Sequence, residues 1–178
     1  MHRIIVVGNS GSGKTTVARA LAEKLDFPYL ELDSIYHQQG WEPLPEDEFR
    51  VRVADFALQP SWVIDGNYTS LGMRDLIWPV ADTLVWLDLS RAVVMGRVIA
   101  RTVKRAITRE ELWNGNREPL SNFTRLDPEK NIIRWAWTRH DHYRQKYSEA
   151  IAEPDAVHLR VVRLQTTKEV DRFLELAS

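Results

Sequence analysis

The sequence predicts an α/β fold of the P-loop NTPase class, a five-stranded parallel sheet with helices on both faces. Short apolar runs alternate with helical patterns along the 178 residues, an order typical of parallel strands joined by helices. The first apolar run leads directly into GNSGSGKT at 8–15, a phosphate-binding loop. At this length residues 1–178 are expected to form a single domain.

The beginning of the chain predicts a strand, a helix and a second strand. RIIVVG at 3–8 is apolar and rich in β-branched residues, and 14–25 has apolar residues at helical spacing. PYLEL at 28–32 alternates like a strand, which we expect to stop at Asp33. The segment 34–45 is rich in aromatic and turn residues and predicts a loop or short helical turns.

The middle of the chain predicts a helix and two further strands. Pro45 opens the helix, whose first turn is acidic, as the positive end of the helix dipole favours. SWVID at 61–65 is a third strand, and it ends at Asp65. TLVWLDL at 83–89 is a fourth strand, and its nearly continuous apolar character indicates helices on both faces.

The last part predicts three helices and the fifth strand. A serine caps a helix over about 91–107, and an Asp-Pro pair opens a long helix over about 128–151. The polar stretch 108–126 between them shows no clear period. AVHLRVVRL at 156–164 is the fifth strand, and a capping box precedes a terminal helix over 167–174.

The loop at 8–15 carries the most specific chemistry in the chain. Its glycines let backbone N–H groups surround phosphates, Lys14 brings a positive charge to the outer phosphates, and the Thr15 hydroxyl can bind Mg²⁺. A glycine turn that merely caps a helix is the weaker alternative, because lysine and threonine both stand where the motif requires them. The predicted nucleotide-binding residues are Gly8, Asn9, Ser10, Gly11, Ser12, Gly13, Lys14, Thr15 and Thr16.

Other features narrow the class of P-loop protein. The sequence contains no NKxD or DxxG motif, by which GTPases recognise guanine and sense the last phosphate. It is also short for a ring-forming or motor ATPase. A small ATP-dependent phosphotransferase therefore fits best, and such an enzyme needs an acceptor site that faces the terminal phosphate.

Two aspartates are candidates for that catalytic edge of the sheet. Asp33 and Asp65 both follow predicted strands, and ligands bind at the carboxyl ends of strands in open α/β sheets. We expect Asp65, with Thr15, on the metal side, and Asp33 to bind the acceptor or take a proton from its hydroxyl. The alternative is that each carboxylate caps a turn. Asp88 follows a strand too and ranks below Asp65.

Arginines supply the opposite charge. Residues 91–147 contain 13 Lys and Arg against 6 Asp and Glu, whereas the segments on either side are net acidic. We expect a positively charged lid over about 105–130, flanked by catalytic arginines, because guanidinium groups bind phosphate oxygens in pairs. The candidates are Arg97, Arg101 and Arg139, with Arg74 as an acceptor contact. Solvated helix arginines that pair with glutamate are the alternative.

The acceptor-binding segment is expected at about 33–60. Tyr36 and Trp41 within it could stack on a planar substrate, although an aromatic residue that covers a small core is at least as common. The chain has no cysteine and no apolar run near 20 residues, so disulfides and a membrane span are not expected. The apolar run after Arg3 is too short for a signal peptide, and we expect a cytoplasmic location.

Several motifs together resemble adenylate-kinase-related P-loop proteins often labelled topology modulation proteins. They are GNSGSGKTT, LDSIYHQQGWEPLPEDEF, WVIDGNYTSLGMRDLIWPVADTLVWLDLSR, RWAWTRHDHYRQKY and VVRLQTTKEVDRFL. The resemblance implies a nucleoside monophosphate kinase-like fold with a helical lid, in which the third strand lies beside the first and Asp65 is the metal-side acid. IDGN replaces the DGFPR of adenylate kinases, so Arg74 would have to replace the missing arginine.

The sequence therefore predicts an ATP- and Mg²⁺-dependent kinase of a small acceptor that remains unnamed. The alternative is a nucleotide-gated regulatory protein that affects DNA topology or binds a partner and turns over little ATP. No DNA-reading module is evident, and a lid explains the basic segment equally well.

Overall fold

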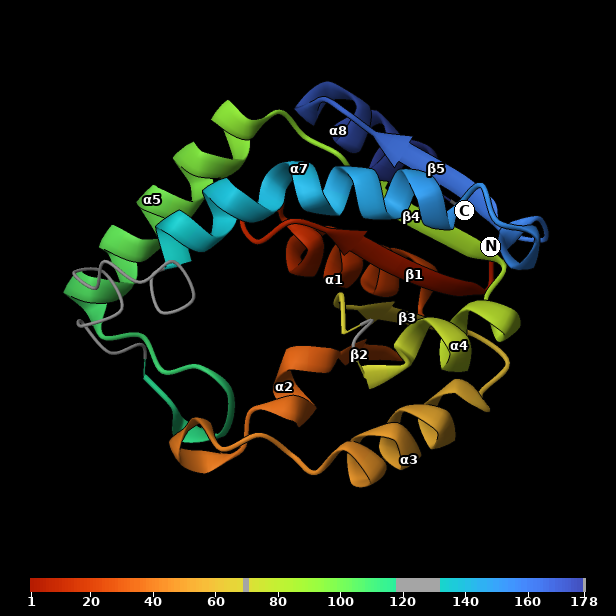
Figure 1. The fold of residues 1–178 in the computed structure, drawn as a ribbon, viewed down its shortest axis with the longest axis horizontal. Coiled ribbons are helices and arrows are strands. Elements are labelled where there is room, and N and C mark those ends of the chain that lie inside the picture. Colours follow the sequence, from red (N-terminus) through yellow and green to blue (C-terminus); the bar gives the residue numbers. More distant parts are fainter. Residues whose placement is uncertain (69–70, 118–131, 178) are drawn as a thin grey trace.

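The five strands form one parallel sheet in the order β2-β3-β1-β4-β5, as a computed structural model shows (Figure 1). The structure describes residues 1–68, 71–117 and 132–177. The strands are β1 Arg3–Gly8, β2 Tyr29–Glu31, β3 Trp62–Asp65, β4 Thr83–Leu87 and β5 Arg160–Leu164. β1 lies at the centre, with β3 on one side and β4 on the other, so the expected position of the third strand beside the first is confirmed.

Helices cover both faces of this sheet. The main helices are α1 Lys14–Leu25, α3 Glu46–Ala57, α5 Arg91–Thr108, α7 Ile132–Ala150 and α8 Thr167–Leu176. Shorter helical turns are α2 Leu32–Tyr36, η1 Gln39–Trp41, α4 Met73–Ile77, η3 Trp78–Val80, η4 Trp113–Gly115 and η5 Pro154–Ala156. No helix in the described ranges is long and apolar enough to cross a membrane.

Alternating residues of β1 divide the core into two layers. Ile4 and Val6 pack with α1, α8 and the first half of α5, whereas Ile5 and Val7 pack with α3, α4 and the end of α7. Because all four side chains are at most 2% exposed, β1 is buried on both faces, as its continuous apolar run requires. In Figure 1, α7 crosses the sheet in front of β1 and β4.

Most predicted elements are confirmed, but the end of the second strand is wrong. β2 ends at Glu31, and Asp33 lies in the first turn of α2. The strand therefore ends one residue before the predicted run 28–32 does. The terminal helix has the predicted cap, since the Thr166 hydroxyl accepts the Glu169 N–H while the Glu169 carboxylate accepts the Gln165 N–H. The predicted start of the long helix near residue 128 lies outside the described residues.

Asp82 joins three strands at the amino end of the sheet. Its carboxylate accepts hydrogen bonds from the N–H groups of His2 and Arg3, at 2.7 and 3.0 Å, and from the Thr83 hydroxyl at 2.6 Å. Its backbone carbonyl accepts the N–H of Arg160 in β5. Burial opposes ionisation, but the hydrogen bonds prevail and lower the pKa of Asp82.

We expect Asp82→Ala to destabilise the fold by about 0.5 to 1.5 kcal/mol, because the partly exposed N–H groups of His2 and Arg3 lose their carboxylate acceptor. A carboxylate with a lowered pKa contributes stability above its unfolded-state pKa of about 3.9, and this contribution is lost as the pH falls through the folded-state pKa. The difference in unfolding free energy from wild type should therefore be constant from pH 5 to 8 and shrink below about pH 4. Urea unfolding measures it, with the exposed Asp171→Ala as the control. A constant difference down to pH 2.5 would contradict this role.

Candidate active site

The phosphate-binding loop connects β1 to α1, and neighbouring elements fix its shape. Gly11 has a φ of +83°, and a Cβ there would lie 2.3 Å from the Val98 side chain of α5. Gly8 has a φ of +149°, and a Cβ there would lie 2.7 Å from the Leu87 carbonyl oxygen of β4. Glycine is therefore required at both positions by backbone conformation and by close packing.

Polar groups line the inside of the loop. The first amides of α1 have no carbonyl acceptor within the helix, so they are available to an anion. The Lys14 ammonium lies 3.3 Å from the Asn9 carbonyl oxygen, and burial lowers its pKa although Asp33 and Asp65 oppose this effect. Ser12 Oγ is buried and has no hydrogen-bond partner in the part of the chain that the structure describes. The loop is thus built to receive phosphate oxygens, while the Thr16 side chain is exposed.

Two carboxylates lie side by side next to the loop. Glu31 and Asp65 are paired in the register of β2 and β3 and are 6% and 2% exposed. The Thr15 hydroxyl lies 3.4 Å from Glu31 Oε1, and the Tyr29 hydroxyl donates to Asp65 at 3.2 Å. Burial raises the pKa of Asp65 to about 6, against a Thr15 hydrogen bond and the Lys14 charge, while Glu31 and Asp33 raise it further.

Glu31 is the residue of this cluster that the sequence analysis missed. It ends β2, and its other carboxylate oxygen accepts a 2.8 Å hydrogen bond from Arg19 of α1. The alternation of PYLEL predicts a strand end at 32 and so points to Asp33, the acid that follows, although Glu31 is an acid within the same run.

Asp33 nevertheless lies near the same cluster. It is close enough for its charge to affect the pKa of both Lys14 and Asp65. Its carboxylate accepts a 2.5 Å hydrogen bond from the Tyr68 hydroxyl. The structure thus brings together the predicted residues Lys14, Asp33 and Asp65, with Asp33 presented by α2 instead of by a strand end.

Two asparagines hold the loop in place and were not predicted in this role. Asn67 follows β3 and bonds both backbone groups of Gly8, with its Nδ2 2.8 Å from the Gly8 oxygen and its Oδ1 3.3 Å from the Gly8 nitrogen. Tyr147 of α7 donates to the same Oδ1 at 2.9 Å. Asn9 is buried and donates to the Ala136 carbonyl of α7 at 2.8 Å. The loop is therefore fixed to β3 and α7 as well as to α5.

The arginines of α5 contact the loop directly. Arg97 Nη1 donates to the Ser12 carbonyl at 2.8 Å, and Arg101 Nη2 donates to Ser10 Oγ at 3.1 Å. These two predicted residues therefore lie at the phosphate-binding loop. Arg139 of α7 lies over the Trp135 ring, with its guanidinium carbon 4.4 Å from the ring centroid.

Three predicted acceptor contacts have other surroundings. Arg74 is not brought to the cluster, because its guanidinium pairs with Glu153 and Asp155 at 3.0 and 2.8 Å and stacks over Trp78. Tyr36 packs its ring against Phe49 and Tyr68. Trp41 contacts His37 and Trp113. Two acids far along the chain hold Arg74, and its local sequence does not reveal them.

Asp88, the lower-ranked acid, is bound in an ion cluster. Arg144 donates to it at 2.8 Å, Arg163 at 2.6 Å and Gln165 at 3.3 Å. With Arg144 so engaged, and Arg91 paired with Asp141, several charges of the basic segment serve internal contacts.

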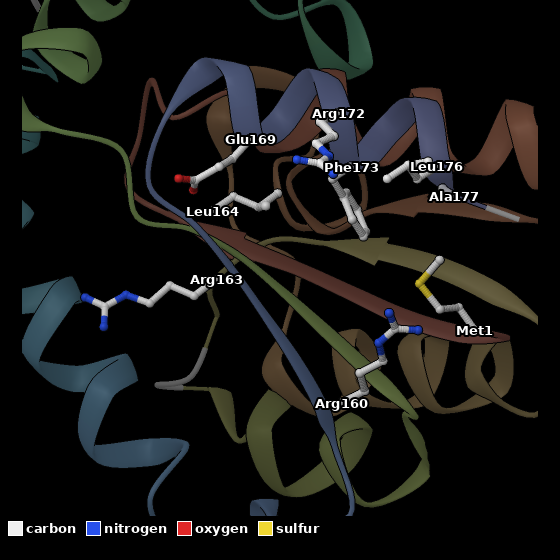
Figure 2. A pocket seen from close by; sticks show the side chains of 9 residues that line it. All are labelled: Met1, Arg160, Arg163, Leu164, Glu169, Arg172, Phe173, Leu176 and Ala177. Atoms are coloured by element: carbon white, nitrogen blue, oxygen red, sulfur yellow. The ribbon is translucent and has the colours of Figure 1, made fainter.

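A cavity of about 450 Å³ lies between β5 and α8, and its lining includes no predicted site residue (Figure 2). Arg160 and Arg163 of the edge strand and Arg172 and Phe173 of α8 contribute to it. Arg160 lies on the edge strand, where a charged side chain discourages pairing with another sheet, whereas Arg163 binds Asp88. The catalytic candidate is therefore the carboxylate cluster at the loop.

The raised pKa of Asp65 gives a stability prediction. Because the folded state disfavours the ionised carboxylate, its charge opposes folding above about pH 6. Asp65→Asn should therefore raise the unfolding free energy at pH 7.5, by about 1 to 3 kcal/mol. The gain should decrease as the pH falls from 6 and disappear below about pH 3, where wild-type Asp65 is protonated in both states. Chemical unfolding measures it, with exposed Asp75→Asn as the matched control. A destabilised Asp65→Asn would contradict a folded state that disfavours the ionised Asp65 carboxylate.

Comparison with known proteins places this site in a family. The sequence model of the Shikimate kinase family matches residues 10–46, which include most of the loop, Glu31 and Asp33. The shikimate kinase of Gloeobacter violaceus is 31% identical over 107 residues, which are 53% of this chain and 60% of that protein. That of Sulfurihydrogenibium sp. is 31% identical over 113 residues, which are 55% of this chain and 67% of that protein. The chain thus spans less than two thirds of the first of these relatives.

An adenylate-kinase-like relative also appears. A putative adenylate kinase of Pyrococcus furiosus is 36% identical over 81 residues, 42% of this chain and 45% of that protein. The adenylate-kinase part of the predicted resemblance is therefore supported, whereas the comparisons name shikimate kinase and do not show the topology modulation family.

Solved structures share the fold. Shikimate kinase from Acinetobacter baumannii in complex with shikimate has a TM-score of 0.54 at 18% identity, covering 99% of this chain and 92% of that one. A gluconokinase from Sinorhizobium meliloti has a TM-score of 0.51 at 19% identity, covering 99% and 89%. These TM-scores show that the chain shares the P-loop kinase fold, and the sequence matches identify relatives within that fold. The chain belongs to the shikimate kinase family of P-loop kinases.

Proposed function

We propose that the protein is an ATP-dependent kinase that transfers the terminal phosphate to a hydroxyl group of a small polar acceptor. The observation that carries this proposal is the convergence of Lys14, Thr15, Asp33 and Asp65 beside a loop shaped for phosphates. This convergence supports a donor site and a carboxylate acceptor site at one edge of the sheet. The use of ATP fits the cytoplasmic location expected from the sequence.

The donor side is built from the loop and α5. The amides at the start of α1 bind phosphate oxygens, and Lys14 neutralises charge on the outer phosphates. Arg97 and Arg101, fixed to Ser12 and Ser10, hold guanidinium groups beside the loop, where negative charge develops during transfer. Arg139 is proposed to add charge from α7.

The residues present fit a magnesium ion. Mg²⁺ typically binds through one or two carboxylates together with phosphate oxygens and water. The Thr15 hydroxyl, the Asp65 carboxylate and the adjoining Glu31 carboxylate form such an oxygen set. Within the described residues no group of three or more histidines or acids forms a complete cage, which suits an ion that arrives with the nucleotide. The ion would neutralise phosphate charge, while Thr15 and Asp65 would hold it.

Asp33 is proposed to accept the proton of the acceptor hydroxyl. The Tyr68 hydroxyl donates to one carboxylate oxygen, which orients the group and leaves the other oxygen for substrate. The same aspartate could bind the acceptor through a second hydroxyl.

The acceptor class follows from the relatives and from one sequence difference. The solved relatives are named for shikimate and gluconate, both hydroxylated carboxylic acids. The IDGN sequence lacks the arginine of the adenylate kinase motif, and Arg74 is bound by Glu153 and Asp155. We therefore propose a hydroxylated carboxylic acid, such as shikimate or a sugar acid, and disfavour a nucleoside monophosphate.

An acceptor panel tests this proposal. Purified protein with Mg-ATP should phosphorylate shikimate, gluconate or a related hydroxy acid, as measured by ADP release and by mass of the product. Lys14→Ala should abolish the reaction and weaken ATP binding, because the positive charge at the outer phosphates is lost. Transfer confined to nucleoside monophosphates would contradict the acceptor class, and absence of ATP binding in the wild type would contradict the function.

With the acceptor found, Asp33→Asn should lower kcat by about 10²- to 10⁴-fold, the usual contribution of a general base. The dissociation constant of Mg-ATP, measured by calorimetry, should change far less than kcat, because Asp33 affects Lys14 and Asp65 only through its charge. Asp75→Asn is the matched control on α4. A variant with unchanged kcat would remove Asp33 from the reaction.

A further inference from the structure

Two turns far apart in the sequence interlock at the edge of the acceptor segment. One is η1 with the preceding residues 37–38, and the other is η4 with the following residues 116–117. In Figure 1 the chain that leaves α5 runs back to the segment that follows α2. We call this contact between residues 34–41 and 113–117 the clasp.

A buried asparagine forms the centre of the clasp. Asn116 is 5% exposed, and its side-chain amide bonds the backbone of the other segment in both directions. Its Oδ1 accepts the N–H of Trp41 at 3.0 Å, and its Nδ2 donates to the carbonyl of Gln38 at 2.8 Å. Removing this buried amide would lose both of these hydrogen bonds between the two segments, although the Trp41 N–H and the Gln38 carbonyl also bond each other at 3.1 Å.

A second asparagine connects the clasp to α2, the helix that carries Asp33. Asn114 Nδ2 donates to the carbonyl of His37 at 2.6 Å and to that of Ser34 at 3.1 Å. Ser34 directly follows Asp33, so the clasp reaches the neighbour of the proposed base.

Three aromatic rings also join the two segments of the clasp. The rings of His37 and Trp113 stack with centroids 5.7 Å apart, and the Trp41 ring meets both edge-on. The Trp41 indole N–H also donates to the Arg117 carbonyl at 3.1 Å. The two segments are therefore joined by side chains from both partners.

The backbone has a positive φ at both turns. Trp41 has a φ of +65°, in the left-handed region that bulky residues rarely adopt, and Asn114 a φ of +55°, which asparagine adopts more readily. A bulky residue in this region persists where surrounding contacts hold it. Trp41 makes such contacts across the clasp.

We propose that Asn116 and Trp113 are positioning residues through which nucleotide binding at the loop orders the acceptor segment. The route is physical: α5 contacts the phosphate-binding loop through Arg97 and Arg101, the chain after α5 forms one half of the clasp, and the clasp holds α2. Nucleotide binding at the loop thereby orders the segment that presents Asp33. The inference rests on the proposed function and deepens it, since donor and acceptor sites bind cooperatively and the coupling is reciprocal.

Amide hydrogen exchange with a non-hydrolysable nucleotide tests the proposal without a known acceptor. In the wild type, Mg-AMPPNP should slow exchange in peptides that cover 33–44 by about fivefold or more, besides its effect on 8–16. In Asn116→Ala the effect on 8–16 should remain and that on 33–44 should fall below about half of the wild-type value. Trp113→Leu breaks the ring contacts independently and should give the same pattern.

Gln145→Ala is the matched control, because it removes an exposed amide on α7 that bonds Glu149 one turn away. Its exchange pattern should equal that of the wild type. Thermal unfolding identifies a variant that has lost its fold, and the other clasp variant then decides. Nucleotide binding that leaves 33–44 unchanged in the wild type, or unchanged protection in both folded clasp variants, would overturn the inference alone. Failure of the wild type to bind Mg-AMPPNP in calorimetry would overturn the proposed function as well.

Discussion

Three carboxylates, those of Glu31, Asp33 and Asp65, lie around the amino end of α1, and the rest of the site is arranged to tolerate them. Two of them are almost completely buried and face each other across adjacent strands, so their mutual repulsion is weakly screened. Lys14 and Arg19 supply positive charge, and the start of α1 adds the positive end of its dipole. The compensation is incomplete, because the pKa of Asp65 remains raised. A dication that binds with the nucleotide would complete the compensation of the carboxylate charges.

Contacts from distant elements add to the loop's own glycines in fixing the shape of the loop that faces these carboxylates. Asn67 forms hydrogen bonds with both backbone groups of Gly8. The Ala136 carbonyl of α7 accepts a hydrogen bond from the Asn9 side chain. Val98 of α5 fills the space that a side chain at Gly11 would need. Three elements from distant parts of the chain therefore hold the donor site in its binding conformation, which reduces the reorganisation that phosphate binding requires. Helix α5 contacts the donor loop, and the chain that follows α5 contacts the acceptor segment through the clasp. The loop and the acceptor segment are therefore connected through α5.

Local pattern was sufficient to predict the strands, the main helices and the donor loop. Buried parallel strands read as apolar runs, and the phosphate-binding motif requires each residue type at a fixed position. The site was predicted in part: Lys14, Asp33, Asp65, Arg97 and Arg101 lie at or near the loop. Glu31 was missed because short strands leave their last residue uncertain. Arg74 was misplaced because Glu153 and Asp155, which bind it, are about 80 residues away, and the clasp depends equally on contacts between distant segments.

The pKa of Asp65 tests most directly whether the cluster of Glu31, Asp33 and Asp65 binds a metal-bound nucleotide. NMR titration of the side-chain carboxyl carbons reports this pKa in the free protein and in the presence of Mg-AMPPNP. The account predicts a pKa of about 6 in the free protein and a clear fall when Mg-AMPPNP binds, because the cation stabilises the ionised form. A pKa near 3.8 in the free protein that does not change on binding would contradict it.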